Sequence, residues 1–201
     1  ATTPPAQMAA TAPTAESAVA ANADYPLTPE GARAFVAAVE KDLFDLSIIS
    51  GRAQWVNSTY ITDDTDALAS YFGAIDTTMR VDYALEAAKF ATAPGLTEET
   101  KRRLTLLRTA LTLPAPTTPG ASQELNDLAT KLQSTYGKGK GTLNGQPING
   151  SDIEAEMGNP ERTPAELKEM WASWHDNVGA PMKDDYAKMV GIANQGAEEL
   201  G

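Results

Sequence analysis

Cysteine is absent from this sequence, and histidine occurs once, at His175. Without cysteine the chain can form no disulfide and offers no thiolate nucleophile. A zinc centre takes three or four His, Cys, Asp or Glu ligands, and the sequence has no pair of histidines one helical turn apart. It also has no Gly-x-Ser-x-Gly motif, so a serine triad would depend on His175. The sequence by itself therefore supplies neither a zinc-protease centre nor a hydrolase centre.

Basic residues are also scarce. There are 16 Lys and Arg against 27 Asp and Glu, which gives a formal net charge of −11 at pH 7. Such a field repels phosphate backbones and favours basic ligands, so we expect no nucleic-acid partner. Long apolar runs are missing as well, because no stretch approaches the roughly 18 apolar residues of a membrane span. We therefore expect no membrane span.

The first 23 residues are dominated by Ala, Thr and Pro and contain too little apolar mass to offset the entropy of ordering. We predict that residues 1–23 form a disordered tether. The chain begins at Ala1 without an initiator Met, and a tether that follows a removed signal peptide has this composition. We therefore expect an exported protein, although a linker in a cytosolic protein would have a similar composition. Residues 24–201 are expected to be ordered.

The ordered part is rich in helix signals. Thr28-Pro29-Glu30 combines a hydroxyl cap, a proline for the first turn and a carboxylate at the positive helix end, so a helix is predicted over Thr28–Asn57. Thr62-Asp63-Asp64 marks a second helix start, and this helix is predicted over Asp63–Ala91. The apolar residues that line one face of the first helix are Phe35, Val39, Leu43 and Leu46.

Further helices are predicted from cap residues along the rest of the chain. Their predicted caps are Thr97, Ser122, Ser151 and Thr163. The last two begin capping boxes, in which a Ser or Thr and a Glu three residues later satisfy each other's backbone donors. The apolar stripe predicted to lie in the core of the helix after Thr163 consists of Leu167, Met170, Trp171 and Trp174.

A glycine-rich segment, residues 137–150, interrupts the helical pattern. Asn144-Gly145 is a strong tight-turn signal and predicts the tip of a small two-stranded hairpin. The predicted fold class is therefore all-α, with long helices, packed helices and one irregular hairpin-like loop.

Two sequence blocks carry a resemblance to a known family. The first is Trp55, then Thr59-x-Ile61-Thr62-x-x-Thr65. The second is Trp171-x-x-Trp174-His175-Asp176-x-x-Gly179, followed by Tyr186 and Asn194-Gln195. Together and in this order, they are similar to segments of the angiotensin-converting-enzyme family. The resemblance spans about Tyr25 to Gly201 and corresponds to about the first third of the family's catalytic domain.

This resemblance implies an exported, almost entirely helical peptidase that releases C-terminal dipeptides from oligopeptides. It implies a zinc ion held by a His-Glu-x-x-His helix and a later Glu, all beyond the end of this chain. Within this chain it implies that the helices Thr28–Asn57 and Asp63–Ala91 form a lid over the cleft, anchored by Trp171 and Trp174. The implied partners are oligopeptide substrates and the remainder of the same catalytic domain.

The sequence departs from the family pattern at several positions. Where family members bind chloride with an arginine, this chain has His175, so chloride binding is expected to be either absent or pH-dependent. Residues that line the outer cleft are replaced by Gln54 and Ser58, and a family Glu is replaced by Gln133. The disulfide of animal members is absent, which indicates a bacterial, periplasmic relative.

The alternative from another functional class is a stand-alone helical binding or scaffolding protein of the periplasm, without catalysis. The two interpretations differ in the surface that they predict. A lid portion should expose an apolar patch where the rest of the enzyme packs, whereas a complete binding module should not.

Overall fold

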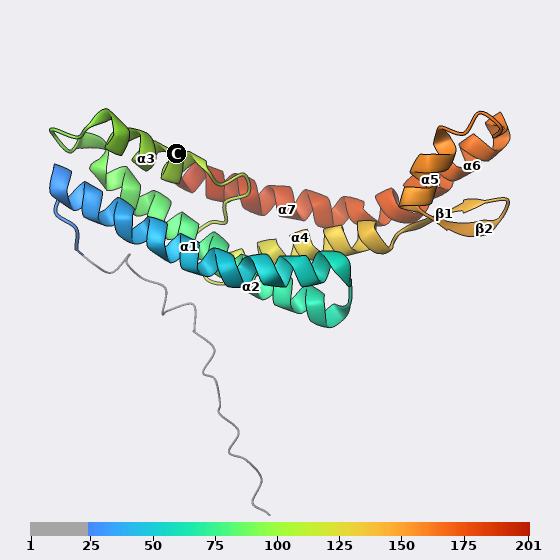
Figure 1. The fold of residues 1–201 in the computed structure, drawn as a ribbon, viewed down its shortest axis with the longest axis horizontal. Coiled ribbons are helices and arrows are strands. Elements are labelled where there is room, and N and C mark those ends of the chain that lie inside the picture. Colours follow the sequence, from blue (N-terminus) through green and yellow to red (C-terminus); the bar gives the residue numbers. More distant parts are fainter. Residues whose placement is uncertain (1–23) are drawn as a thin grey trace, which may run out of the picture.

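The computed structural model describes residues 24–201 and is almost entirely helical, which confirms the all-α prediction. The predicted tether, residues 1–23, lies outside the described residues. Figure 1 shows an elongated molecule with a helical bundle at one end and a small hairpin-containing arm at the other. The elements are α1 Pro29–Thr59, α2 Asp63–Lys89, η2 Phe90–Thr92, α3 Glu98–Thr109, α4 Ala121–Lys138, β1 Lys140–Leu143, β2 Gln146–Asn149, α5 Gly150–Met157, α6 Pro164–Trp174, the π-helix η3 His175–Gly179 and α7 Ala180–Glu199.

Most helices begin at the predicted cap residues. The Thr28 hydroxyl accepts the Gly31 N–H at 3.1 Å, and Thr62 and Thr163 both form complete capping boxes. Two predicted caps are wrong. The helix assigned to Ser122 starts after Gly120, which makes no side-chain cap bond.

The short helix assigned to Ser151 starts instead after Asn149. The Asn149 Oδ1 accepts the Asp152 N–H at 2.8 Å, so an asparagine cap replaces the predicted Ser151–Glu154 capping box. Asparagine is as good an N-cap as serine. The helix therefore begins two residues earlier than predicted, because its cap is Asn149 and not Ser151.

The bundle consists of α1, α2 and α3 and is held by aromatic packing. The Phe35 ring lies 5.5 Å from the Phe90 ring and 6.3 Å from the Tyr83 ring, measured between centroids. Burial of such rings is the main source of stability in a helical bundle. The buried residues of this cluster are Ala32, Phe35, Val36, Val39, Met79, Tyr83, Ala87, Phe90, Leu96 and Leu104.

Helices α4 and α7 lie side by side and connect the bundle to the arm (Figure 1). A second apolar cluster joins them, and its members include Leu125, Leu128 and Met189. The C-terminal end of α7 returns to the bundle, where Gly196 packs directly against the backbone of Pro114 and Ala115. This close approach leaves no room for a side chain at position 196.

The arm, residues 140–179, contains the predicted hairpin. Strands β1 and β2 pair antiparallel, with Leu143 opposite Gln146. Asn144 and Gly145 have φ values of 52° and 72°, as a two-residue type I′ turn requires, so the turn prediction is confirmed. The apolar contacts of the arm are fewer than those of the bundle, and its buried hydrophobic residues are Ile153, Met170 and Val178.

The predicted core stripe of α6 is only partly correct. Met170 is fully buried, but Trp171 is 56% exposed and Trp174 is half-buried. Helix α6 packs on β1 through the side that carries Met170 and Ser173, and the adjacent position 171 points away from that contact. On α2, Leu68 is likewise exposed, at 49%.

Candidate functional site

The cleft-lining residues predicted on α1 lie one helical turn apart near its C-terminal end. Gln54 and Ser58 are both exposed, and the Ser58 hydroxyl donates to the Gln54 backbone carbonyl at 2.8 Å. The Gln54 side-chain amide donates to the Ala69 carbonyl of α2 at 3.5 Å, at the limit of a hydrogen bond. These two side chains therefore share one surface of the bundle.

The other two predicted site residues lie on different elements. Gln133 is exposed on α4, and α2 packs between α4 and α1. His175 is exposed in the π-helix that joins α6 to α7. Within residues 24–201 no hydrogen bond or ion pair joins these four side chains, so the described structure does not assemble them into one site.

A row of exposed apolar side chains on α1 was not predicted. Phe44, Ile48 and Trp55, which we call the α1 stripe, are 65%, 46% and 71% exposed. Helical periodicity places the stripe opposite Phe35 and Val39, which face the bundle core. The signal was present in the sequence, because residues spaced by four and seven share a helix face. The prediction for this helix considered only the apolar face that lies in the bundle core.

The first family block forms the corner between α1 and α2. Asn57 is 3% exposed, and its side-chain amide donates to Asp66 at 2.6 Å. The Thr65 hydroxyl accepts the Thr62 N–H at 2.9 Å and donates to the Tyr60 carbonyl at 2.7 Å. These contacts fix the angle between the two helices, so the block has a structural role at the base of the predicted lid.

The second family block contains the π-helix. The His175 Nδ1 lies 2.7 Å from the Trp171 carbonyl oxygen, and the two rings lie 4.2 Å apart between centroids. Because a carbonyl oxygen only accepts, Nδ1 must carry a proton in this contact. In the neutral ring Nε2 then has no proton to donate to an anion.

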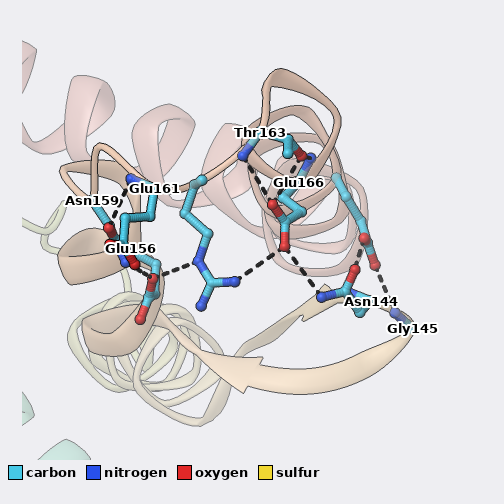
Figure 2. Close-up of polar contacts among 9 residues, drawn as sticks. Asn144, Gly145, Glu156, Asn159, Glu161, Thr163 and Glu166 are labelled. Atoms are coloured by element: carbon cyan, nitrogen blue, oxygen red, sulfur yellow. Dashed lines mark hydrogen bonds and ion pairs between the residues drawn. The ribbon is translucent and has the colours of Figure 1, made fainter.

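Carboxylates organise the arm around the hairpin turn (Figure 2). Glu169 accepts the backbone N–H groups of Asn144 and Gly145, both at 2.9 Å. Glu166 accepts the Thr163 backbone N–H at 2.9 Å and also contacts Arg162 at 3.1 Å. The bonds from Thr163, chiefly its backbone N–H, lower the pKa of Glu166 to about 2. These groups form a structural network without a reactive nucleophile.

The described residues contain neither a candidate metal site nor a membrane-spanning helix. Within residues 24–201, no three His, Asp or Glu side chains come together in a way that could hold a metal ion. The side chains present therefore do not fit a zinc site. In the same part of the chain, no helix combines the length and apolar composition that a membrane span requires.

Comparison with known proteins gives the family of the chain. Comparison with curated proteins gives no match. The family model of peptidase M2, described as angiotensin-converting enzyme, matches residues 27–201, which covers all the helices and the hairpin. The chain therefore belongs to the peptidase M2 family, and the two sequence blocks at the α1–α2 corner and at the π-helix lie within the matched span.

Proposed function

We propose that this chain is the lid and cleft-wall portion of a zinc-dependent peptidyl-dipeptidase that releases C-terminal dipeptides from oligopeptides. Membership in the peptidase M2 family supports a peptidase that acts on peptides. Helices α1 and α2 would be the lid, held at a fixed angle by the Asn57–Asp66 corner. Lids of this kind gate access to a catalytic site and exclude water from it.

The observation that carries the lid proposal is the α1 stripe. Exposed aromatic side chains aligned along one helix face are unusual on a monomeric soluble protein and mark a surface that another part packs against. Phe44, Ile48 and Trp55 occupy the face of α1 that points away from the bundle core. Gln54 and Ser58 border the same end of the helix. A stand-alone binding module gives no reason for this stripe.

The chemistry would be supplied by another part of the protein. The side chains of residues 24–201 do not fit a zinc site. The metal that activates water in this kind of peptidase would therefore be held by residues outside this span. The role of the described residues would be to enclose and position the peptide. We propose export to the periplasm on the composition of residues 1–23.

The test uses the natural protein that carries this chain, in full length. We expect the release of C-terminal dipeptides from an N-blocked oligopeptide, detected by mass spectrometry, with loss on chelation and recovery with zinc. Its intact mass should be about three times that of this chain. A natural protein without dipeptide release and without further sequence would favour the helical binding module.

The stripe is tested by introducing charge into it. Ile48→Asp in the full-length protein should abolish activity while the unfolding of the α1–α3 bundle is unchanged. The matched control is Leu106→Asp on α3, which is 48% exposed and lies off the stripe. Equal activity of the two variants would contradict the lid proposal.

A further inference from the structure

A pocket of about 300 Å³ lies between α2 and the segment that joins α3 to α4. Its α2 wall carries Tyr71, Ile75 and Asp82, and its opposite wall carries Pro116 and Pro119. This volume is at the lower end of the range for small-molecule sites, roughly 300–1,000 Å³, and is large enough for one long side chain. The pocket lies apart from the α1 stripe and from the family blocks.

The wall opposite α2 is held in place by α7. The Thr117 backbone N–H and hydroxyl both donate to Glu199, at 2.7 Å and 2.9 Å. Directly before this wall, Pro114 and Ala115 pack against Gly196. The Ala121 N–H donates to the Thr118 carbonyl at 3.1 Å, which ties the segment to the start of α4. The pocket is therefore formed before any ligand binds, which lowers the entropy cost of binding.

Within the described part of the chain, the pocket is lined by one acidic residue, Asp82, and by no basic residue. Asp82 makes no hydrogen bond or ion pair within residues 24–201, and no lysine, arginine or histidine lines the pocket. Asp82 is an exposed residue, and partial desolvation by the surrounding protein raises the pKa of its carboxyl, with no cation to offset it. Asp76 on the same helix differs, because Arg80 binds it at 2.7 Å. Asp82 is thus a carboxylate at the edge of a preformed pocket without a counter-charge.

We propose that this pocket binds the cationic side chain of an arginine or lysine in an oligopeptide. The guanidinium or ammonium group would pair with Asp82, and the aliphatic stem would lie against Ile75 and the two proline rings. The Tyr71 ring on the α2 wall adds an aromatic surface, on which cations are stabilised. The net charge of −11 raises the local concentration of basic peptides.

The test compares a cation with its neutral isostere. Nα-acetyl-arginine amide is titrated into the isotopically labelled chain, and Nα-acetyl-citrulline amide serves as the uncharged control. We expect the arginine compound to bind with a Kd of about 1 mM, as its size allows. The backbone resonances that shift should belong to residues 75–82 and 117–123. The citrulline compound should bind at least about tenfold more weakly.

A matched pair of variants assigns the binding to Asp82. Asp82→Asn keeps the shape of the side chain and should weaken binding about tenfold or more. Asp64→Asn removes the same charge from an exposed position of α2 outside the pocket and should leave binding unchanged. Thermal unfolding of both variants checks that they fold.

A second measurement reports on the ion pair itself. The pKa of the Asp82 carboxyl, followed by carbon NMR, should fall when the arginine compound binds, because a nearby cation stabilises the charged form. Equal binding of the citrulline compound, equal binding to the Asp82→Asn variant, or an unchanged Asp82 pKa would each overturn the proposal. None of these measurements depends on peptidase activity, so the pocket and the lid are tested separately.

Discussion

The α1–α3 bundle and the arm are stabilised by different kinds of contact. In the bundle, Phe35 is fully buried and packs against the rings of Tyr25, Tyr83 and Phe90. In the arm, the hairpin turn is held by hydrogen bonds from its backbone to carboxylates of α6. Apolar burial does not depend on pH, whereas a carboxylate contact is lost on protonation. The two ends of the molecule should therefore respond differently to the same perturbation.

The difference also bears on function. The bundle buries enough apolar surface to keep its shape while it exposes the α1 stripe on its outer face. The arm buries little, so its geometry depends on polar groups placed at defined positions, with the π-helix next to them. Under the proposed function, a rigid bundle would suit a lid that moves as one body, and the polar arm would suit a connection whose geometry can adjust.

The largest expected effect comes from breaking the bundle core. Phe35→Ala should lower the free energy of unfolding by about 3–5 kcal/mol, because a buried ring is replaced by a cavity. Phe44→Ala on the same helix should change it by less than about 0.5 kcal/mol, because Phe44 is 65% exposed. Urea denaturation measures both values. A similar loss in both variants would show that the stripe is buried in solution.

A destabilisation of intermediate size is expected when one of the two tryptophans of the arm is replaced, but not when the other is. Trp174 contacts the Tyr136 ring at 5.4 Å, and an added Cβ at Gly150 would lie 2.7 Å from its Cη2 atom. Trp174→Ala should therefore destabilise the arm by about 2 kcal/mol, less than removal of a fully buried ring. Trp171→Ala should stay within about 0.5 kcal/mol, because Trp171 is 56% exposed. Hydrogen exchange of the β1 and β2 amides measures both effects, and a larger loss in the Trp171 variant would contradict them.

A smaller effect should appear on acidification and be concentrated in the arm, where the pKa values of Glu156, Glu166 and Glu169 are all lowered. The pKa of Glu166 is lowered from 4.5 to about 2, and the pKa of Glu169 is also lowered, chiefly by the Gly145 N–H. A lowered folded-state pKa means that stabilisation is present above pH 4.5 and is lost as the pH falls towards 2. Amide resonances of Asn144, Gly145 and Thr163 should move over this range while those of the buried α1 residues Phe35 and Val39 do not.

Two variants test which carboxylate of the arm is responsible for the change on acidification. Glu169→Gln mimics the protonated carboxyl and should loosen the hairpin turn at neutral pH. The control is Glu161→Gln in the same arm, because within residues 24–201 the Glu161 carboxylate accepts no hydrogen bond. If both variants left the turn unchanged, the network in Figure 2 would not hold the hairpin.

Helix positions and the hairpin were predictable from the sequence because they depend on local chemistry. Thr28, Thr62 and Thr163 each cap a helix with their own side chain, and Asn144-Gly145 sets its own turn. Ser151 failed as a prediction because two competent caps lie close together and sequence patterns cannot rank them.

The candidate site was less predictable because it depends on which helix faces meet. Apolar residues such as Trp171 and Phe44 have the same spacing in the sequence whether their side chains face the core or a surface that another part of the protein covers. The pocket beside Asp82 joins α2 to a segment more than thirty residues later in the sequence. The absence of a counter-charge there, among residues 24–201, is a property of the folded chain. The resemblance located the family blocks, and the structure adds the contacts, such as the Asn57–Asp66 hydrogen bond, that fix the corner at the first one.

The smallest expected effect concerns His175. The contact of Nδ1 with the Trp171 carbonyl leaves the neutral ring without a free N–H, so chloride should bind only to the doubly protonated ring. His175→Arg provides a permanent cation and should broaden the chloride-35 NMR signal more than the natural chain does, whereas His175→Gln should broaden it no more than the natural chain. If all three chains broadened the signal equally, chloride would have to bind elsewhere, because only the Arg variant carries a permanent cation at position 175.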